Sequence, residues 1–242
     1  MRQNDIMGDV AGALRLLTRL PLPHSAHIPG PGAAWAWPLV GVVVGGIAAL
    51  VAMVPVGAGV AAGLVLGVQA MLTGAMHEDG LADTADGLWG GWDKARRLAI
   101  MKDSHIGTYG VMALLVVGLV RWSALVAVIG AGAWWGVVVV AVVSRAPMAV
   151  LMAAMESARG AGLAHAVGMV PRPSAGVAVL IAVGFALTLG AAGVWLLVCV
   201  GAVVLALARV AQAKIGGQTG DICGASQQLA EAAGLVVLAT LV

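Results

Sequence analysis

Between Ala33 and Met76 the sequence reads AAWAWPLVGVVVGGIAALVAMVPVGAGVAAGLVLGVQAMLTGAM, without a charged residue at any position. A helix that crosses a bilayer needs roughly 20 mainly apolar residues. This stretch is long enough for two such helices, and residues 55–57 form a short uncharged connection between them. It therefore predicts a membrane hairpin with spans over residues 33–54 and 58–76.

The same pattern continues along the chain. Further apolar spans are predicted over residues 110–130, 133–154, 175–190 and 192–210, with short uncharged connections near 130–132 and 190–193. A last apolar run, 232–242, is too short to cross alone, but it could join 225–231 in one helix that enters the membrane partway. We therefore predict an all-α fold: a polytopic transmembrane helical bundle of about six to seven membrane helices arranged as hairpins.

The composition agrees with this prediction. The 242 residues are 61% hydrophobic and 10% charged, whereas soluble domains are about 45–50% apolar and about 25% charged. This excludes an ordinary soluble domain and predicts one integral membrane domain over residues 1–242, with residues 1–32 as an N-terminal cytoplasmic or interfacial segment. The two cysteines form no disulfide framework or metal pair. The bilayer is the expected surrounding, and no nucleic-acid partner is expected.

The positive charges indicate which side of the membrane the polar loops face. Ten of the 13 lysines and arginines fall in the polar segments 1–32, 77–109, 155–174 and 211–231, and none lies in the short connections. By the positive-inside rule these segments are cytoplasmic. We predict a multi-pass protein of the cytoplasmic (inner) membrane, with the catalytic polar segments 77–109 and 211–231 facing the cytoplasm.

Glycines recur at helical spacing in the first two spans. Gly41 and Gly45 are four residues apart, and Gly59, Gly63 and Gly67 repeat the same interval. Small residues at this spacing let membrane helices pack closely. Such faces permit a homo-oligomer but do not require one.

An acidic cluster interrupts the apolar sequence directly after the first hairpin, in His77-Glu78-Asp79-Gly80-Leu81-Ala82-Asp83-Thr84-Ala85-Asp86-Gly87. On a helix, Asp79, Asp83 and Asp86 share one face. Like charges at this spacing repel one another, and a bound cation relieves the repulsion. Hard oxygen ligands suit Mg²⁺, Mn²⁺ or Ca²⁺. The alternative is a solvated acidic loop or helix cap.

Two further polar constellations lie in the same predicted cytoplasmic segments. Residues 102–110 contain Lys102, Asp103 and His105, which could hold a phosphate and orient a hydroxyl. Residues 216–225 are rich in glycine and contain a candidate metal ligand in Asp221. Backbone N–H groups in such a turn can bind an anion, although each constellation alone is also compatible with an ordinary glycine-rich turn. The candidate anion-binding residues here are Gly217, Thr219 and Gly220.

Arg121 and Arg145 lie inside predicted spans. Charges within the membrane are costly and usually face a partner or a water-filled cavity. We predict that one or both line the cavity and either offset the charge of the carboxylates or bind substrate phosphate. The alternatives are snorkelling and a structural ion pair.

The motifs together resemble the cobalamin synthase family, the adenosylcobinamide-GDP ribazoletransferases. The resemblance rests on residues 77–87 and on Ile100-Met101-Lys102-Asp103-Ser104-His105-Ile106-Gly107-Thr108-Tyr109-Gly110. It continues at residues 17–21, 37–41, 144–147 and 217–221, in order along nearly the whole chain.

The resemblance implies a Mg²⁺-dependent enzyme that joins adenosylcobinamide-GDP to α-ribazole, or to its 5′-phosphate, and releases GMP. Phosphoryl transfer of this kind fits the residues. Candidate metal ligands are Glu78, Asp79, Asp83, Asp86 and Asp221. Candidate catalytic residues are Asp83, Asp86, Lys102, Asp103 and His105, and the proton acceptor is left open between a carboxylate and His105.

Two other functions are compatible with an acidic cluster in a membrane protein. A CDP-alcohol phosphotransferase has a similar aspartate pattern, but that family places an alanine-arginine pair soon after the first Asp-Gly, where this chain has Leu81-Ala82-Asp83. A divalent-cation transporter would place its carboxylates near the bilayer midplane. Here they flank a long polar segment, which favours catalysis at the interface.

Overall fold

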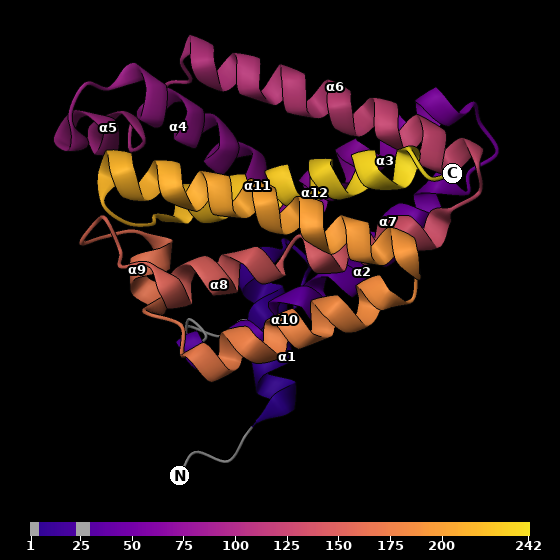
Figure 1. The fold of residues 1–242 in the computed structure, drawn as a ribbon, viewed down its shortest axis with the longest axis horizontal. Helices are drawn as coiled ribbons and strands as arrows, with labels where there is room; N and C mark the ends of the chain where they lie inside the picture. Colours follow the sequence, from indigo (N-terminus) through magenta and orange to yellow (C-terminus); the bar gives the residue numbers. More distant parts are fainter. Residues whose placement is uncertain (1–4, 23–29) are drawn as a thin grey trace.

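Helices are the regular elements of residues 5–22 and 30–242, the part of the chain that this computed structural model describes (Figure 1). In chain order they are α1 (Ile6–Leu17), the 3₁₀ helix η1 (Pro31–Ala36), α2 (Trp37–Ala52), α3 (Ala58–Thr73), α4 (Met76–Gly90), α5 (Lys94–Ile100), α6 (Thr108–Gly130), α7 (Trp134–Val143), α8 (Ala146–Ala154), α9 (Leu163–Val167), α10 (Arg172–Leu187), α11 (Ala191–Ile215) and α12 (Gly220–Ala239). The predicted all-α class is confirmed.

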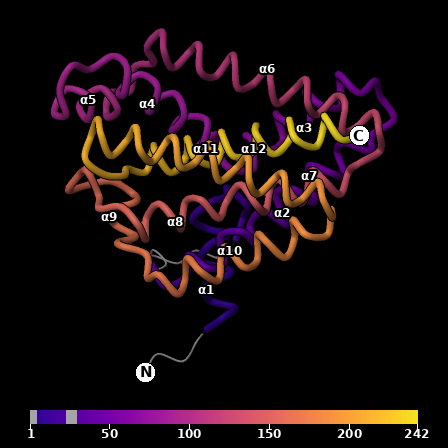
Figure 2. Tube along the Cα trace, viewed as in Figure 1, coloured from indigo at the N-terminus to yellow at the C-terminus, as the bar shows by residue number. Residues whose placement is uncertain are grey.

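The helices long and apolar enough to cross a membrane confirm a polytopic bundle. Within the described residues there are 5 such spans, and up to 6 if the bent pair α3–α4 counts as one. The 5 are Pro31–Ala52, Thr108–Gly130, Trp134–Ala154, Ala191–Ile215 and Gly220–Ala239. In Figures 1 and 2 the turns α6–α7 and α10–α11 lie at one end of the bundle, and α4, α5 and α9 lie towards the other. This is the separation of short and long connections that the hairpin pattern predicts.

Two predicted spans differ in length from the helices observed. The span predicted over residues 175–190 is α10, which at 16 residues is shorter than the helices that qualify as spans on their own. The final apolar run does join the residues before it, but the helix begins at Gly220 and has 20 residues, enough to cross fully rather than partway. Polar side chains in this helix do not end it, because they find partners inside the bundle.

Two predicted boundaries also move. Most of the polar segment predicted over residues 211–231 is helical, since α11 continues to Ile215 and α12 starts at Gly220. The single span predicted over residues 133–154 is divided into α7 and α8 at Ser144 and Arg145. Pro147 follows in the first turn of α8, where its missing N–H leaves no helical bond unmade.

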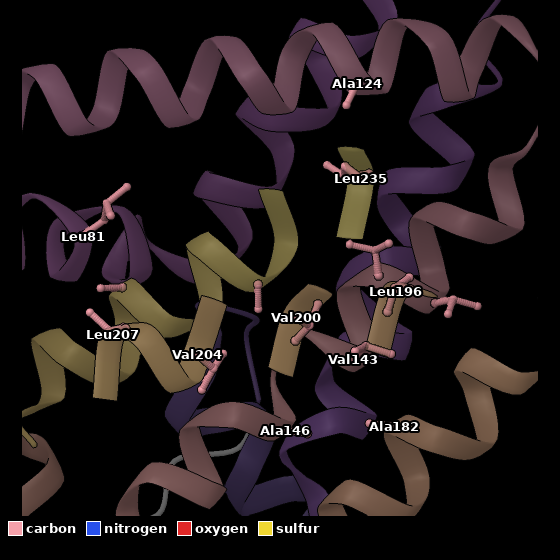
Figure 3. Close-up of a cluster of buried hydrophobic side chains, with 14 of the residues drawn as sticks. Leu81, Ala124, Val143, Ala146, Ala182, Leu196, Val200, Val204, Leu207 and Leu235 are labelled. Carbon is pink, nitrogen blue, oxygen red and sulfur yellow. The ribbon is translucent and has the colours of Figure 1, made fainter. Parts of the chain in front are cut away.

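Helix α12 is the centre of the bundle. It packs against α4, α6, α7, α8 and α11, and 72% of its apolar window is buried, against 22% for α6 and 28% for α11. Figure 3 shows how Leu81, Ala124 and Leu235, from α4, α6 and α12, belong to one buried cluster. The outer faces of α6 and α11 are therefore available to lipid.

The glycine prediction is confirmed for one helix and wrong for part of another. A Cβ on Gly45 would lie 2.8 Å from Cβ of Ala141, and one on Gly41 would overlap the α7 backbone. The missing side chains thus allow α2 and α7 to pack closely. A Cβ on Gly63 or Gly67 would meet no atom within 4 Å, so these glycines make no close helix contact within the described chain.

Candidate active site

The acidic helix α4 is turned sharply away from α3. Gly74 (φ +66°) and Ala75 (φ +55°) both adopt left-handed backbone conformations between the two helices, and the helix axes meet at 91°. A non-glycine residue in this region is uncommon. The turn makes α4 a separate helix, and it carries Asp79, Asp83 and Asp86 as the spacing predicts.

A pair of glycines lets α4 cross directly against the first turns of α12. A Cβ on Gly80 would lie 2.9 Å from the carbonyl oxygen of Asp221 and 3.1 Å from Cα of Gly224. A Cβ on Gly224 would in turn lie 3.3 Å from Cα of both Gly80 and His77. The two backbones touch here, so the sequence-distant Asp221 is brought to the acidic helix.

The crossing gathers negative charge from two helices. Along α4, Asp79 is exposed, Asp83 is partly buried and Asp86 is buried. The charges of Asp221, Asp79 and Asp86 all act on Asp83. The structure therefore brings Asp79, Asp83 and Asp221 into one electrostatic cluster, which we call the carboxylate surface.

The donor chemistry of the carboxylate surface fits a hard divalent cation. Mg²⁺ usually takes only one or two protein carboxylates and completes its shell with water and phosphate oxygens. Across residues 5–22 and 30–242, no three His, Cys, Asp or Glu side chains are arranged as a ready metal cage. An open surface on which one or two of Asp79, Asp83 and Asp221 contact the ion, and water or phosphate completes its shell, is chemically compatible with Mg²⁺.

Asp86 has a role that sequence reasoning missed. Its Oδ2 accepts a hydrogen bond from the N–H of Gly107 at 2.7 Å, and its Oδ1 accepts one from the N–H of Gly110 at 2.9 Å. Gly107 is the N-cap residue of α6, so the carboxylate satisfies N–H groups that have no partner within that helix. Asp86 thereby joins the acidic helix to the start of α6.

Replacing Gly110 with alanine is expected to destabilise the fold by about 1–3 kcal/mol. The new Cβ would overlap Oδ2 of Asp86 and lie 3.0 Å from Cγ1 of Ile106. The matched control is Gly118→Ala in the same helix, where a Cβ meets nothing within 4 Å. That variant should be unchanged or gain up to about 1 kcal/mol. Thermal unfolding of both in one detergent tests this, and equal stability of the two variants would contradict the capping role.

The loop before α6 is open to solvent. Lys102, Asp103 and His105 are all exposed. Nδ1 of His105 lies 2.7 Å from Oδ1 of Asp103, and the backbone N–H of His105 donates to the same oxygen at 3.1 Å. These hydrogen bonds from His105 lower the pKa of Asp103 below its usual value. Asp86 holds this loop at the C-terminal end of α4, roughly 10 Å along the helix from Asp79.

Arg121 lies inside the bundle rather than at the carboxylate surface. It is 4% exposed. Its guanidinium donates to Glu231 at 2.7 Å, Gln228 at 2.5 Å and Gln69 at 3.0 Å. Glu78, a candidate metal ligand, accepts from Gln228 at 3.0 Å and is 3.7 Å from Arg121. Arg121 thus forms the structural ion pair that the sequence left as an alternative, and Glu78 is directed towards it.

Arg145 is also buried, at 1% exposed. It donates to the carbonyl oxygen of Ala141 at 2.6 Å, and its Nε has no hydrogen-bond partner. Ser144 beside it accepts from Gln227, which also donates to Glu231. The break between α7 and α8 therefore borders the same internal network, which we call the buried polar network: Gln69, Glu78, Arg121, Ser144, Gln227, Gln228 and Glu231.

The glycine-rich turn before α12 is held by the loop after α8. The N–H of Gln218 donates to the carbonyl oxygen of Glu156 at 2.9 Å, and a Cβ on Gly217 would overlap that same oxygen. Thr219 caps α12 by accepting from the N–H of Ile222 at 3.3 Å. Gly220 alone of these predicted anion ligands is exposed.

Arg159 is the site residue that sequence reasoning missed. It donates to Oδ2 of Asp221 at 2.7 Å, and its Nε has no hydrogen-bond partner. In the sequence it was only one of several loop arginines that indicate membrane orientation. The backbone pairing of residues 156–158 with Gln218 brings it to Asp221, and no local sequence pattern signals that pairing.

Comparison with known proteins covers almost all of the chain. The family model described as cobalamin-5-phosphate synthase matches residues 9–239. A protein of Brucella ovis named adenosylcobinamide-GDP ribazoletransferase is 40% identical over 257 aligned residues, covering 98% of both chains. A protein of Sinorhizobium medicae with the same name is 41% identical, covering 96% of this chain and 95% of its own. No solved structure matches.

The matched residues include α4, the loop before α6, Arg159 and the whole of α12. The carboxylate surface, the loop before α6 and Arg159 are thus within the region shared with the family. By the extent of this match, the chain belongs to the cobalamin-5-phosphate synthase family.

Proposed function

We propose that this membrane transferase joins adenosylcobinamide-GDP to α-ribazole, or to α-ribazole 5′-phosphate, with release of GMP. The observation that carries the proposal is the crossing of α4 and α12 at Gly80 and Gly224, which gathers Asp79, Asp83 and Asp221. Relatives named for this reaction support it.

In the proposed reaction a ribazole hydroxyl oxygen forms a bond to the cobinamide-linked phosphorus of the pyrophosphate. The bond from that phosphorus to the bridging oxygen breaks, and the bridging oxygen leaves with GMP. The hydroxyl proton passes to a carboxylate. Asp83 is better placed for this than His105, because it lies beside Asp79 and Asp221 whereas His105 lies in the exposed loop.

Mg²⁺ would be held by one or two of the carboxylates Asp79, Asp83 and Asp221, with water and phosphate oxygens completing its shell. There it would neutralise phosphate charge and stabilise the departing oxygen. Arg159 supplies a positive charge from the protein itself. Because its Nε has no partner and its NH2 is shared with Asp221, the guanidinium can turn part of its fork to a phosphate. Lys102, exposed in the loop between α5 and α6, is a second candidate for phosphate contact.

The carboxylate surface is proposed to face the cytoplasm from the inner membrane. At this end of the bundle lie Lys94, Arg97 and Lys214, and Arg97 donates to the carbonyl oxygen of Lys214 at 3.1 Å. The ammonium of Lys214 donates to the carbonyl oxygen of Leu88 at 2.7 Å. Positive charge gathered at one end is typical of a cytoplasmic face.

Purified protein is expected to form the corrinoid product and GMP from adenosylcobinamide-GDP with either ribazole substrate, in the presence of Mg²⁺. Chelation should abolish both products, and added Mg²⁺ should restore them. Chromatographic detection of product and GMP measures the reaction, with CDP-diacylglycerol plus an alcohol as the control for CDP-alcohol transfer. A monodisperse preparation that forms no product would contradict the proposed reaction, and full activity in excess chelator would contradict the metal requirement alone.

A further inference from the structure

A long apolar groove lies between α8, α10 and α11, and we call it the α8 groove. It has a volume of about 350 Å³, and every side chain that lines it in the described part of the chain is apolar. Figure 1 shows α8 between α10 and α11, and Figure 3 draws five of the lining residues: Val143, Ala146, Ala182, Val200 and Val204. No member of the carboxylate surface or of the buried polar network is among the described residues that line it. The groove is therefore separate from the candidate active site.

Small residues on each of the three helices leave this space open. Ala146 on α8, Ala182 on α10 and Gly201 on α11 all line the groove, and a Cβ on Gly201 would meet no atom within 4 Å. The walls reach the surface of the bundle, since Val179 is 38% exposed and Leu205 is 54% exposed. Because α11 is long and apolar enough to cross a membrane, an occupant can enter the groove sideways from the bilayer.

The dimensions of the groove match one fatty-acyl chain. An apolar cavity of about 150 Å³ holds benzene, which has six carbons, so the volume of the groove has room for about fourteen carbons on the same scale. Along α11 the lining runs from Leu197 to Ala208, which is about 16 Å at 1.5 Å per residue. One leaflet is half of a hydrocarbon core that is roughly 30 Å thick. The groove thus has the volume of most of an acyl chain and the length of one leaflet.

Each wall of the groove leads to an exposed arginine on the side of α4 and α5. Arg209 directly follows the lining residue Ala208 and lies four residues after Leu205, so it continues the lining face of α11. Arg172 precedes Val179 by seven residues and shares its face of α10. Both arginines are exposed, and in the described chain neither side chain makes a hydrogen bond or an ion pair.

The two arginines lie at a similar depth along the hairpin. Counted from the turn between α10 and α11 at 1.5 Å per residue, Arg172 is about 22 Å away and Arg209 about 27 Å away. Arg172 is also the first residue of α10, where the helix dipole disfavours a cation, so stabilisation of that helix does not account for it. Unpaired cations at one end of an apolar groove complement a ligand with an apolar chain and an anionic head.

We propose that the α8 groove binds one acyl chain of an anionic phospholipid, drawn from the leaflet on the side of α4 and α5. The phosphate of the lipid contacts Arg209, and the charge of Arg172 adds to the attraction. The chain fills the space between the three helices, and the groove selects anionic over neutral lipids through the two arginines. This site is additional to the transfer reaction and does not depend on it.

One variant blocks the groove, and a second makes the same change outside it. Gly201→Phe places a ring in the groove at an exposed glycine whose Cβ would meet no atom within 4 Å. Gly184→Phe is the matched control in α10. Gly184 is also exposed and also has no atom within 4 Å of its Cβ, but it does not line the groove.

A second pair of variants tests the charges. Arg172→Gln/Arg209→Gln removes the two arginines at the end of the groove. Lys94→Gln/Arg96→Gln is its control, because it removes two exposed positive charges from α5, at the same end of the bundle but away from the groove. All four residues are exposed, so these changes do not disturb the core.

Delipidated protein in one detergent is titrated with phosphatidylglycerol or with phosphatidylcholine that carries the same acyl chains, and native mass spectrometry counts the bound lipids. The unaltered protein is expected to bind one phosphatidylglycerol about tenfold or more tightly than phosphatidylcholine, since each arginine contributes about fivefold. The arginine double variant should lose this preference. Gly201→Phe should weaken binding of both lipids by about tenfold or more, because each methylene displaced from the groove counts about fourfold. Both controls should stay close to the unaltered protein.

Three results would overturn the proposal. Equal affinity of the unaltered protein for the two lipids, or a preference that persists in the arginine double variant, would show that the arginines do not select the headgroup. Unchanged phosphatidylglycerol binding in Gly201→Phe would show that the chain lies elsewhere. If Gly201→Phe dissociated an oligomer and left lipid binding unchanged, the occupant of the groove would be a second copy of the chain. Because lipid binding is measured without substrates, none of these results bears on the proposed transfer reaction.

Discussion

Asp83→Asn is expected to lower kcat for ribazole transfer by about 10²–10³-fold. The substitution keeps the shape of the side chain and removes the negative charge that lies among Asp221, Asp79 and Asp86. With that charge gone, the carboxylate surface loses both a cation ligand and its best-placed proton acceptor. The measurement is kcat over a range of Mg²⁺ concentrations.

The control for Asp83→Asn is Glu156→Gln. Glu156 is an exposed carboxylate in the segment beside α12, and only its backbone is used in the pairing with Gln218. It should therefore retain the kcat of the unaltered protein. Unchanged turnover in Asp83→Asn would remove Asp83 from the mechanism, whereas an equal loss in both variants would indicate a general effect of lost surface charge.

Glu231→Gln is expected to destabilise the folded protein by about 3–5 kcal/mol. Glu231 is 2% exposed and accepts from Arg121 at 2.7 Å. Removing one charge of a buried pair leaves the other uncompensated, which costs more than the pair itself contributes. Thermal unfolding in detergent, followed by the fraction of monodisperse protein, measures the loss.

The double variant Arg121→Gln/Glu231→Gln provides the matched test. It removes both charges, so it should recover at least half of the stability lost by Glu231→Gln alone. If the two single losses instead add in the double variant, the side chains do not act as a pair. Comparison with Asp83→Asn also distinguishes two roles. The buried polar network is expected to determine stability, and the carboxylate surface is expected to determine turnover.

The fold could largely be predicted because the length of each apolar run and the positions of the charges can be read directly from neighbouring residues in the sequence. A charge-free run long enough to cross the bilayer has few alternatives to a helix, and the lysines and arginines mark one end. The breaks could not be predicted this way. Ser144 and Arg145 divide one apolar run, and Gly74 and Ala75 turn another by 91°. These breaks depend on contacts with other helices, which apolar length and charge placement do not reveal.

The glycines show the same limit. Gly41 and Gly63 each have another glycine four residues away. Gly41 packs against α7, whereas a Cβ on Gly63 would meet no atom within 4 Å in the described chain. Spacing shows that a close approach is permitted, but the arrangement of helices decides which face is used. Gly80 is the clearest case, because its partner Gly224 lies far away in the sequence and no spacing pattern shows that the two helices cross there.

Within the candidate site, the sequence predicted which residue types are present, but it did not predict where each side chain points. Asp79 and Asp83 lie on the expected face of one helix. Their neighbour Glu78 is on another face and accepts a hydrogen bond from Gln228 inside the bundle. Polar residues within an apolar helix, such as Gln227 and Glu231, are a signal of internal pairing, and they could have identified the partners of Arg121 in advance. Arg159 had no such signal.

The two helices of the α10–α11 hairpin differ in length, and this difference bears on how far the end of the bundle with the carboxylate surface extends beyond the bilayer. Both helices leave the turn at Gly190, but α10 has 16 residues and α11 has 25, and Figure 1 shows α11 reaching farther towards the end that carries α4 and α5. At 1.5 Å per residue the difference is about 13 Å. A lipid headgroup layer is roughly 5–7 Å deep. With the start of α10 at the hydrocarbon boundary, the end of α11 would rise clear of the headgroups, and water-soluble substrates would reach the carboxylate surface without entering the bilayer.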